Sequence, residues 1–540
     1  MTGGYMGGTG KSESAMELLS GVDGVFLNLE TPATPMHVGS LHLFETPPGY
    51  RGSFYSVVRR MMESRMVPVL RRRLAALPLQ LANPVWLQGE VDLDEHIRRV
   101  RVPAPGTWSQ LEAVVAGLHA ELLDRSRPLW MIHVFDGLEG GARAYYFKIH
   151  HAMLDGQAGV ALAGALFDTS PDPAPRPKAR ARVADEYPGT LALAAVALRH
   201  DAAQYIRLMR ELPGAMRTLA AIAGNSVSSF LTGSVRGSSA KSRGAAGTDD
   251  APRLSELRRS LSFGPRTAFN VAITPERGFA TASLPRAGLK AIAAANNATV
   301  NDVVLALCSG ALRRYLRRTA SIPRKSLIAA MPISLREPGN TEMRTQAMLS
   351  LVSLATNVAD PVRRLQAIRD SSAATKAAAR GAKSVIPTDI PLLGAPWLLG
   401  ALAALYGRSR VVDTLPVPAN VLVSNVPGPP VPLYVGGLRM SGYWPLSIVE
   451  HGVGLNITLI DYAGTLFFGF VVARNAVPDS RALADDFLAA FAELQQCVQK
   501  VPKVRTALAP AARRKAVAKP AASRGKAVRP RVAGQGSHHA

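Results

Sequence analysis

Residues 169–254 limit what this chain can fold into more than any other feature, because they mark a boundary between two α/β segments. They begin with the Pro-rich, charged run TSPDPAPRPKARARVADEYPG, continue as one or two amphipathic helices, and end in the flexible low-complexity stretch TGSVRGSSAKSRGAAGTDDAPR. A chain of 540 residues is also too long for one ordinary hydrophobic core. The sequence therefore predicts two folded halves, 1–168 and 255–499, joined by a linker over 169–254.

Both halves show the alternating strand and helix periodicities of an α/β fold. In the first half, two strand-like runs flank the turn signal EGG and predict a β-hairpin over 130–150. Further strands are predicted at 37–45, 279–285, 326–335, 348–357, 418–427, 453–461 and 465–473. Helices are predicted at 54–66, 108–123, 156–168, 286–297, 299–318 and 480–499. Because the pattern restarts after the linker, the two halves are predicted to have similar architectures.

The chain is strongly basic, with 63 Lys and Arg against 39 Asp and Glu and a formal net charge of +24. Eleven of these cations lie from Lys500 onward, where no acidic residue occurs. Residues 500–540 are therefore predicted to be a disordered basic tail, and the rest of the chain stays basic without it. Such a charge predicts attraction to an anionic phospholipid surface, to nucleic acid or to a phosphate-bearing ligand.

The compartment is indicated by what the sequence lacks. With only two cysteines a disulfide framework is excluded, and a reducing cytoplasm fits; Cys308 lies in an apolar run and is predicted to be a core residue. The N-terminus has no apolar signal-peptide region. The longest apolar segment, 390–407, is broken by Pro391 and Pro396 and falls short of the ~20 residues of a spanning helix. It is expected to pack in a core or to dip into a membrane interface.

The run AYYFKIHHAMLDGQAG, residues 144–159, carries the chemically most informative cluster, HHxxxDG. Its residue types suit three roles. They could bind a metal, although no further ligand motif accompanies them. They could instead pin a strand-to-helix turn, or a histidine with a pKa near ~6.5 could accept a proton from an alcohol.

General-base catalysis requires a reaction in which the enzyme itself supplies no nucleophile. No G-x-S-x-G elbow occurs in the chain, and neither cysteine has an exposed polar setting. Direct attack of a substrate hydroxyl on an activated acyl donor fits this requirement. Such a scheme needs a base, a site for the acyl carrier and hydrogen-bond donors for the tetrahedral oxyanion.

The motif and its surroundings resemble a known family. HHxxxDG is similar to the active-site motif of coenzyme-A-dependent acyltransferases and of peptide-synthetase condensation domains. LETPATPMHVGSL, LDRSRPLW, TVNDVVLALCSGALRRYL, MPISLR and SNVPGPP follow the order found in bacterial wax ester synthase/diacylglycerol acyltransferases, from about Glu17 to about Gln499. The resemblance implies an α/β fold of two chloramphenicol-acetyltransferase-like halves. Each half would be a mixed sheet flanked by helices, with the active site in a tunnel between the halves.

The same resemblance implies roles for individual residues. His151 would be the base that deprotonates the acceptor hydroxyl, His150 would position its neighbour, and Asp155 would hold the loop. Substrate-binding positions would be Gly156, Pro128, Leu129, Trp130, Asn301, Asp302, Ser424 and Asn425. A helix N-cap accounts for Asn301 nearly as well as a channel position does, and a strand-end turn accounts equally for Ser424 and Asn425. Met131 departs from the family, because an acid is expected there, and no metal ligand is expected.

The implied activity is transfer of a long-chain fatty acyl group from acyl-CoA to the hydroxyl of diacylglycerol, of a fatty alcohol, or of both. No cofactor is implied, because acyl-CoA is a substrate. The protein would lie in the cytoplasm, peripheral on the anionic inner membrane or on lipid droplets. One alternative is a condensation-type enzyme that uses a carrier-protein thioester and another acceptor. The other is a lipid-granule or nucleic-acid binding protein, although no specific nucleic-acid partner is expected from a solvated charge run.

Overall fold

The structure is a computed structural model that describes residues 17–19, 21–75, 83–154, 156–172, 263–334, 347–382 and 411–500, with isolated positions between 185 and 210 and at 405. Most of the predicted linker, the apolar segment 390–407 apart from Leu405, and the predicted tail beyond Lys500 lie outside the described residues.

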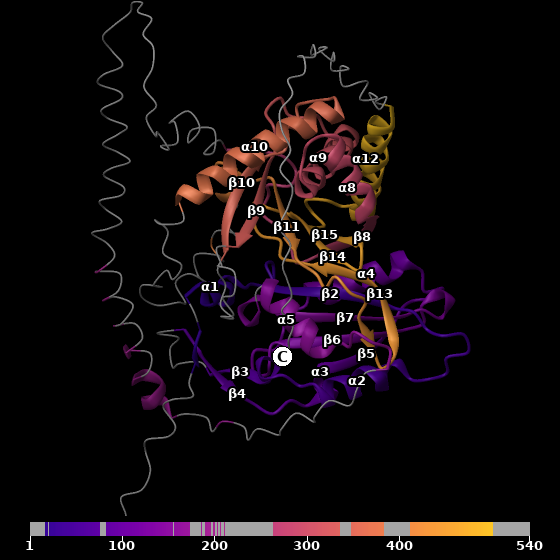
Figure 1. Ribbon diagram of the computed structural model, residues 1–540. Coiled ribbons are helices and arrows are strands. Elements are labelled where there is room, and N and C mark those ends of the chain that lie inside the picture. The colour runs from indigo at the N-terminus through magenta and orange to yellow at the C-terminus, as the bar shows by residue number, and fades with distance from the viewer. Residues whose placement is uncertain are drawn as a thin grey trace, which may run out of the picture. The chain divides into compact units, whose positions relative to one another are not determined.

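Two six-stranded mixed sheets and one three-stranded sheet organise the described part of the chain (Figure 1). The first large sheet has the order β12 (Tyr434–Val435), β13 (Leu438–Leu446), β2 (His37–Phe44), β7 (Arg143–His150), β6 (Trp130–Asp136) and β5 (Ile97–Arg101). The second has the order β10 (Ala347–Ser353), β9 (Ile328–Ser334), β11 (Val421–Val426), β14 (Leu455–Tyr462), β15 (Thr465–Ala473) and β8 (Arg277–Pro285). The small sheet joins β1 (Glu17–Leu18), β4 (Val85–Gln88) and β3 (Arg72–Ala75).

The helices of the described residues are distributed over both halves. The first half holds α1 (Gly21–Leu29), α2 (Phe54–Ser64), α3 (Leu93–His96), α4 (Trp108–Ala120), α5 (Gly156–Leu166) and the 3-10 helices η2 (Pro68–Arg71), η4 (Glu139–Gly141) and η5 (His151–Met153). The second half holds α8 (Arg286–Ala295), α9 (Val300–Thr319), α10 (Pro361–Ala382), η6 (Val411–Asp413) and α12 (Ser480–Lys500). The expected α/β fold with two sheet-containing halves is confirmed.

Local sequence signals explain the elements nearest the motif. β6 and β7 pair antiparallel across the EGG turn, as predicted, and Gly140 and Gly141 adopt positive φ there. In α9, the Thr299 side chain accepts from the Asp302 N–H while the Asp302 carboxylate accepts from the Thr299 N–H, a complete capping box. Fourteen of the 20 residues of α9 are buried, including Cys308 as predicted.

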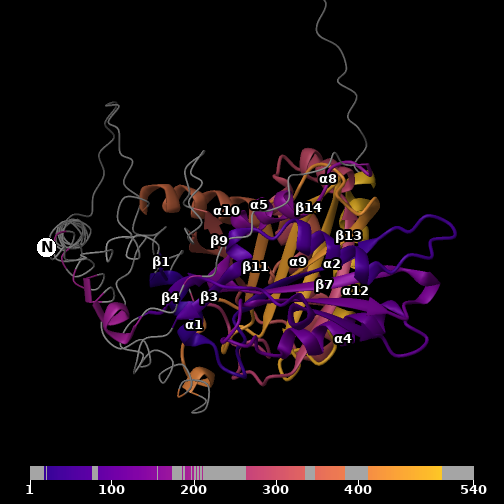
Figure 2. The ribbon, with the colours of Figure 1, turned by 90° about the horizontal axis from the view of Figure 1, so that it is seen from below.

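The two sheets do not correspond to the two sequence halves. β13 comes from the second half of the chain, yet it pairs antiparallel with β2 and so completes the first sheet (Figure 1, Figure 2). The crossing strand lies close to β15 of the second sheet, where a Cβ built on Gly469 would stand 1.8 Å from the Pro445 carbonyl oxygen. Only glycine allows this approach, so Gly469 permits the contact through which the sheets are tied together.

No single helix among the described residues is long and apolar enough to cross a membrane. The pair α8 and α9 passes such a test only when taken together, and the two helices are bent by 98° at their junction.

Candidate active site

The two histidines of the motif lie where β7 changes into a short 3-10 helix. His150 is the last residue of β7 and His151 is the first residue of η5. The His150 N–H donates to the Leu129 carbonyl at 2.9 Å, and the His151 N–H donates to the Met36 carbonyl at 2.9 Å. The backbone of the pair is therefore held between the segments that precede β6 and β2.

The His150 ring is fully buried and held on both sides. Its Nδ1 accepts the Ala152 N–H at 3.1 Å, and its Nε2 lies 3.4 Å from Glu30 Oε1. Because Nδ1 is an acceptor, the neutral ring carries its proton on Nε2, which faces the carboxylate. Both ring nitrogens therefore face protein groups, and His150 is unsuited to take a proton from a substrate.

Glu30, which follows α1, is a buried carboxylate that the sequence-based prediction did not single out. Its side chain is 2 % exposed. Burial by itself would raise the pKa of Glu30, but the contacts with His150, the Met36 amide and Arg125 outweigh burial and lower this pKa to about 2. Glu30 is therefore ionised at neutral pH. The available sequence signal was a lone acid in the otherwise uncharged run FLNLETPATPM.

His151 differs from His150 in being only partly buried. Its imidazole stacks on the phenyl ring of Phe26 from α1, with ring centroids 4.0 Å apart and planes inclined by 17°. An aromatic neighbour restricts the orientation of the ring without taking a hydrogen bond from it. Of the two histidines, His151 has the setting that general-base chemistry requires.

Two further buried histidines lie near the pair, and neither is suited to act as a general base. His37 lies opposite His150 in the sheet, and His119 of α4 contacts Tyr146 through its Nδ1 at 2.6 Å. Burial, together with nearby positive groups, lowers the pKa of His37 well below its usual value, and burial lowers that of His119 to about 3. Both are therefore neutral hydrogen-bonding groups of the interior.

Among the remaining predicted residues, the PLW segment lies directly beside the motif. Trp130 pairs with Ile149 in the sheet, and its indole N–H donates to the Leu70 carbonyl at 2.7 Å. Leu129 and Trp130 are fully buried, and Pro128 is buried as well. Asp155 lies outside the described residues, and Gly156 is the first residue of α5.

The other predicted positions belong to elements of the second half. Asn301 is partly buried in the first turn of α9, whereas Asp302 is 2 % exposed and closes the capping box with Thr299. Thr299, rather than Asn301, is therefore the N-cap. Ser424 and Asn425 lie near the end of β11, with Ser424 partly buried and Asn425 exposed. A substrate-binding role for these four positions stays a prediction.

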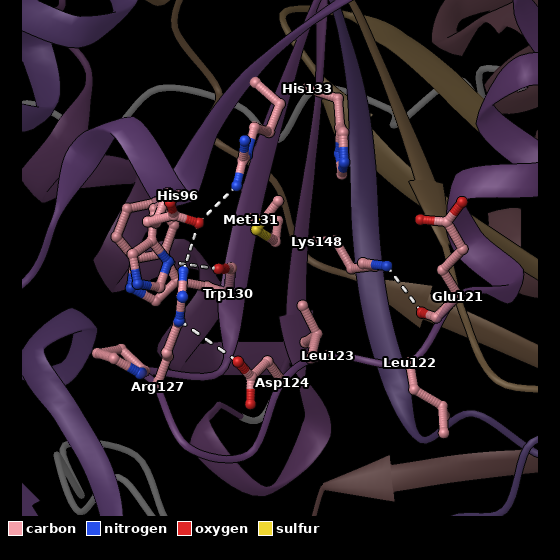
Figure 3. A pocket seen from close by; sticks show the side chains of 13 residues that line it. His96, Glu121, Leu122, Leu123, Asp124, Arg127, Trp130, Met131, His133 and Lys148 are labelled. Atoms are coloured by element: carbon pink, nitrogen blue, oxygen red, sulfur yellow. Dashed lines mark hydrogen bonds and ion pairs between the residues drawn. The ribbon is translucent and has the colours of Figure 1, made fainter.

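A cavity of about 290 Å³ opens beside β6 and β7, and β7 ends at His150 (Figure 3). Its lining includes Met131, the position at which an acid was expected. Lys148 Nζ donates to the Leu118 and Glu121 carbonyls at 2.7 and 2.8 Å, which caps the C-terminal end of α4.

The cavity lining carries both acidic and basic side chains. Burial lowers the pKa of Lys148 to about 8, and burial together with Lys148 lowers that of His133 to about 4. Glu95 pairs with both Arg98 and Arg127 at 2.5 Å. The cavity is therefore polar and is lined by charges of both signs.

Other chemistries find little support in the described residues. Burial raises the pKa of the Cys308 thiol to about 12, so this cysteine is not a thiolate nucleophile. The described part of the chain contains no group of three or more His, Cys, Asp or Glu side chains arranged to hold a metal ion.

Comparisons with known proteins match nearly the whole chain. The family model of the wax ester synthase/diacylglycerol acyltransferase catalytic domain matches residues 19–304, and that of the corresponding C-terminal domain matches residues 345–495. The chain belongs to the wax ester synthase/diacylglycerol acyltransferase family. The catalytic-domain match of this family includes the histidine pair as well as Phe26 and Glu30.

Individual relatives agree with this assignment. A putative diacylglycerol O-acyltransferase of Mycobacterium tuberculosis is 36% identical over 488 residues, which cover 89% of this chain and 100% of the relative. A probable diacylglycerol O-acyltransferase of the same organism is 34% identical over 496 residues, with the same coverage. The solved structure of a wax ester synthase/diacylglycerol acyltransferase from Marinobacter aquaeolei VT8 is 26% identical, with a TM-score of 0.60, and the match covers 89% of this chain and 100% of that one.

Proposed function

We propose that this protein transfers a long-chain fatty acyl group from acyl-CoA to the hydroxyl of diacylglycerol, of a fatty alcohol, or of both, with His151 as the general base. The observation that carries the proposal is the difference between the two histidines of the motif. His150 is fully buried with both ring nitrogens facing protein groups, whereas His151 is only partly buried and its ring stacks on Phe26.

The proposed reaction needs no enzyme nucleophile. His151 takes the proton of the acceptor hydroxyl while the hydroxyl oxygen attacks the thioester carbonyl. When the tetrahedral intermediate collapses, the carbon–sulfur bond breaks, and the coenzyme A thiolate receives the proton that His151 holds. The products are an ester and free coenzyme A, and the base returns to its neutral form. Acyl-CoA is a substrate in this scheme, and the transfer requires no metal or cofactor.

The substrate channel and the cellular site are part of the same proposal. The channel between the halves would be shaped by Pro128-Leu129-Trp130 and by Asn301-Asp302, with Ser424 and Asn425 near the reacting carbonyl. The thioester and the hydroxyl would then reach His151 from different mouths. Because the body of the chain is basic, the protein would act in the cytoplasm at an anionic membrane or lipid-droplet surface. Binding to vesicles of phosphatidylglycerol should then exceed binding to phosphatidylcholine and should weaken as salt is raised. Equal binding to both lipids without salt dependence would contradict the electrostatic part.

The activity is tested with purified protein, labelled palmitoyl-CoA, and either hexadecanol or diolein as acceptor. Wild-type protein should release coenzyme A and form labelled ester in equal amounts. His151→Ala should lower turnover by at least about 10²-fold, the usual contribution of a positioned base. Glu139→Gln, which alters an exposed residue of the β6–β7 turn, is the control and should match wild type. Turnover of His151→Ala within about tenfold of wild type would exclude His151 as the base.

A further inference from the structure

The segment between α1 and β2 folds back on itself immediately in front of the histidine pair. The Thr34 N–H donates to the Thr31 carbonyl at 2.9 Å, and the Thr31 N–H donates to the Thr34 carbonyl at 3.3 Å. The Thr34 hydroxyl also donates to the Leu29 carbonyl at 3.2 Å. These bonds close residues 30–36 into a tight loop, which brings its two ends, Glu30 and Met36, next to each other.

From this loop, the carboxylate of Glu30 contacts His150 directly and is linked to His151 through Met36. One of its oxygens, Oε1, lies 3.4 Å from His150 Nε2 and accepts the Met36 N–H at 3.0 Å. Met36 in turn accepts the His151 N–H at 2.9 Å through its carbonyl. Glu30 therefore acts on the ring of His150 directly and on the backbone of His151 through a single residue.

Arg125 holds the other carboxylate oxygen. Its guanidinium donates to Glu30 Oε2 through Nη2 at 2.9 Å and through Nε at 3.2 Å. Nη2 also donates to the Leu27 carbonyl at 2.7 Å. The Arg125 side chain is 44 % exposed, whereas Glu30 is 2 % exposed. The arginine thus fixes the carboxylate from the solvent side and leaves Oε1 for the histidine side.

The other titratable groups near Glu30 are neutral or more distant. His37 Nδ1 lies 4.0 Å from Oε1, but the opposite nitrogen of that ring contacts the His119 carbonyl at 2.5 Å and must carry the proton. Lys148 and Glu30 attract each other, although the ammonium of Lys148 is bonded to the end of α4. Arg125 is therefore the cation that neutralises Glu30 by direct contact.

Both oxygens of the Glu30 carboxylate are occupied within the site, Oε1 by the Met36 N–H beside His150 and Oε2 by Arg125. We propose that Glu30 is a positioning residue for acyl transfer. It places a negative charge 3.4 Å from Nε2 of His150 and, through Met36, holds the backbone place of His151, so that the His151 imidazole faces the acceptor hydroxyl. This role rests on the proposed function of His151 as the base.

The test compares wild type, Glu30→Gln, Glu30→Asp, His151→Ala and the control Glu139→Gln in the palmitoyl-CoA assay, from about pH 5 to about pH 9. Glu30→Gln keeps the size of the side chain but removes its charge. It should lower kcat by at least about tenfold and leave the KM for acyl-CoA within about twofold. Loss of a nearby negative charge also disfavours a protonated imidazole, so the acidic limb of the rate profile should move to lower pH. Glu30→Asp, which keeps the charge, should recover part of the rate and return the acidic limb toward its wild-type position.

The outcomes distinguish failure of the positioning role of Glu30 from failure of the proposed acyl transfer. An unchanged kcat and acidic limb in Glu30→Gln, with His151→Ala inactive, would overturn the role of Glu30 and leave the acyltransferase proposal intact. A wild-type protein that forms no ester would overturn both.

If Glu30→Gln does not fold, Arg125→Gln tests the same contact from its exposed side, with exposed Arg101→Gln as its control. Arg125→Gln should lower kcat by a smaller factor at unchanged KM. A rate equal to that of Arg101→Gln would count against the proposal.

Discussion

The phenyl ring of Phe26 lies nearly parallel to the imidazole of His151, with centroids 4.0 Å apart and an interplanar angle of 17°. Phe26 lies in α1, which leads directly into Glu30, so one short segment contacts both histidines of the motif. The first helix of the described residues, α1, therefore borders the candidate active site.

Phe26→Ala should lower kcat without abolishing it, because the His151 ring loses one stacking partner but keeps its backbone anchor. Aromatic pairs contribute about 0.5–1.5 kcal/mol beyond buried area, which corresponds to a loss of roughly two- to tenfold in rate. Phe26→Tyr keeps the ring and should stay close to wild type. Initial rates at saturating acyl-CoA check this, and equal losses in both variants would show that stacking is not the relevant contact.

Substitutions of the two histidines should be distinguishable by stability, although both should remove activity. His151→Ala should remove activity and leave the melting temperature nearly unchanged, because the ring is partly exposed. His150→Ala should remove activity and also lower the free energy of unfolding by about 2 kcal/mol, because it leaves a cavity and deprives Glu30 of a partner. Thermal unfolding of both variants provides the measurement. Equal melting temperatures would argue that the His150 ring does not support the Glu30 contacts.

The sequence located those parts of the fold that depend on local signals. β7 is an aromatic-rich run that follows a glycine turn and pairs with its nearest strand along the chain, so local signals were enough to find it. β13 could not be found in this way, because it contains Gly442 and Pro445 and its partner β2 lies near the other end of the chain. Its place in the first sheet depends on packing that no local pattern records.

The candidate site also combines features that local sequence signals predict with features that depend on long-range packing. HHxxxDG identified the histidine pair, but the sequence could not tell which of the two rings is only partly buried. The surroundings of the rings depend on Glu30 and Phe26, which the fold brings to the pair. In the sequence, a buried glutamate that follows a helix cannot be distinguished from a solvent-exposed one. The resemblance also predicted a channel role for Asp302, and the structure adds a capping role that the pattern did not assign to it.

Thr299 and Asn301 should respond differently if the helix start has separate capping and substrate-binding positions. Thr299→Ala removes the side-chain acceptor of the capping box and should cost about 1 kcal/mol of stability, with donor chain-length preference unchanged. Asn301→Ala leaves the box intact, so a change in its product profile across donor chain lengths would report on the channel. An unchanged profile together with wild-type KM values would exclude Asn301 from substrate binding.

The Glu30 contacts also predict how the protein responds to acid. The pKa of Glu30 is about 2 in the folded protein, against 4.5 for an ordinary glutamate. Because the folded state binds this proton less readily than the unfolded chain, the stabilisation is fully present above about pH 4.5. It is lost as the pH falls toward about 2. For a side chain that is 2 % exposed, the shift corresponds to a contribution on the order of 3 kcal/mol. Urea unfolding of wild type and Glu30→Gln at about pH 6 and about pH 3 checks this expectation. The difference in free energy of unfolding between wild type and Glu30→Gln should be large at about pH 6 and should shrink at about pH 3. Exposed Glu139→Gln should show no such change.

If the difference between wild type and Glu30→Gln stays constant between the two pH values, the charge of Glu30 does not stabilise the histidine pair.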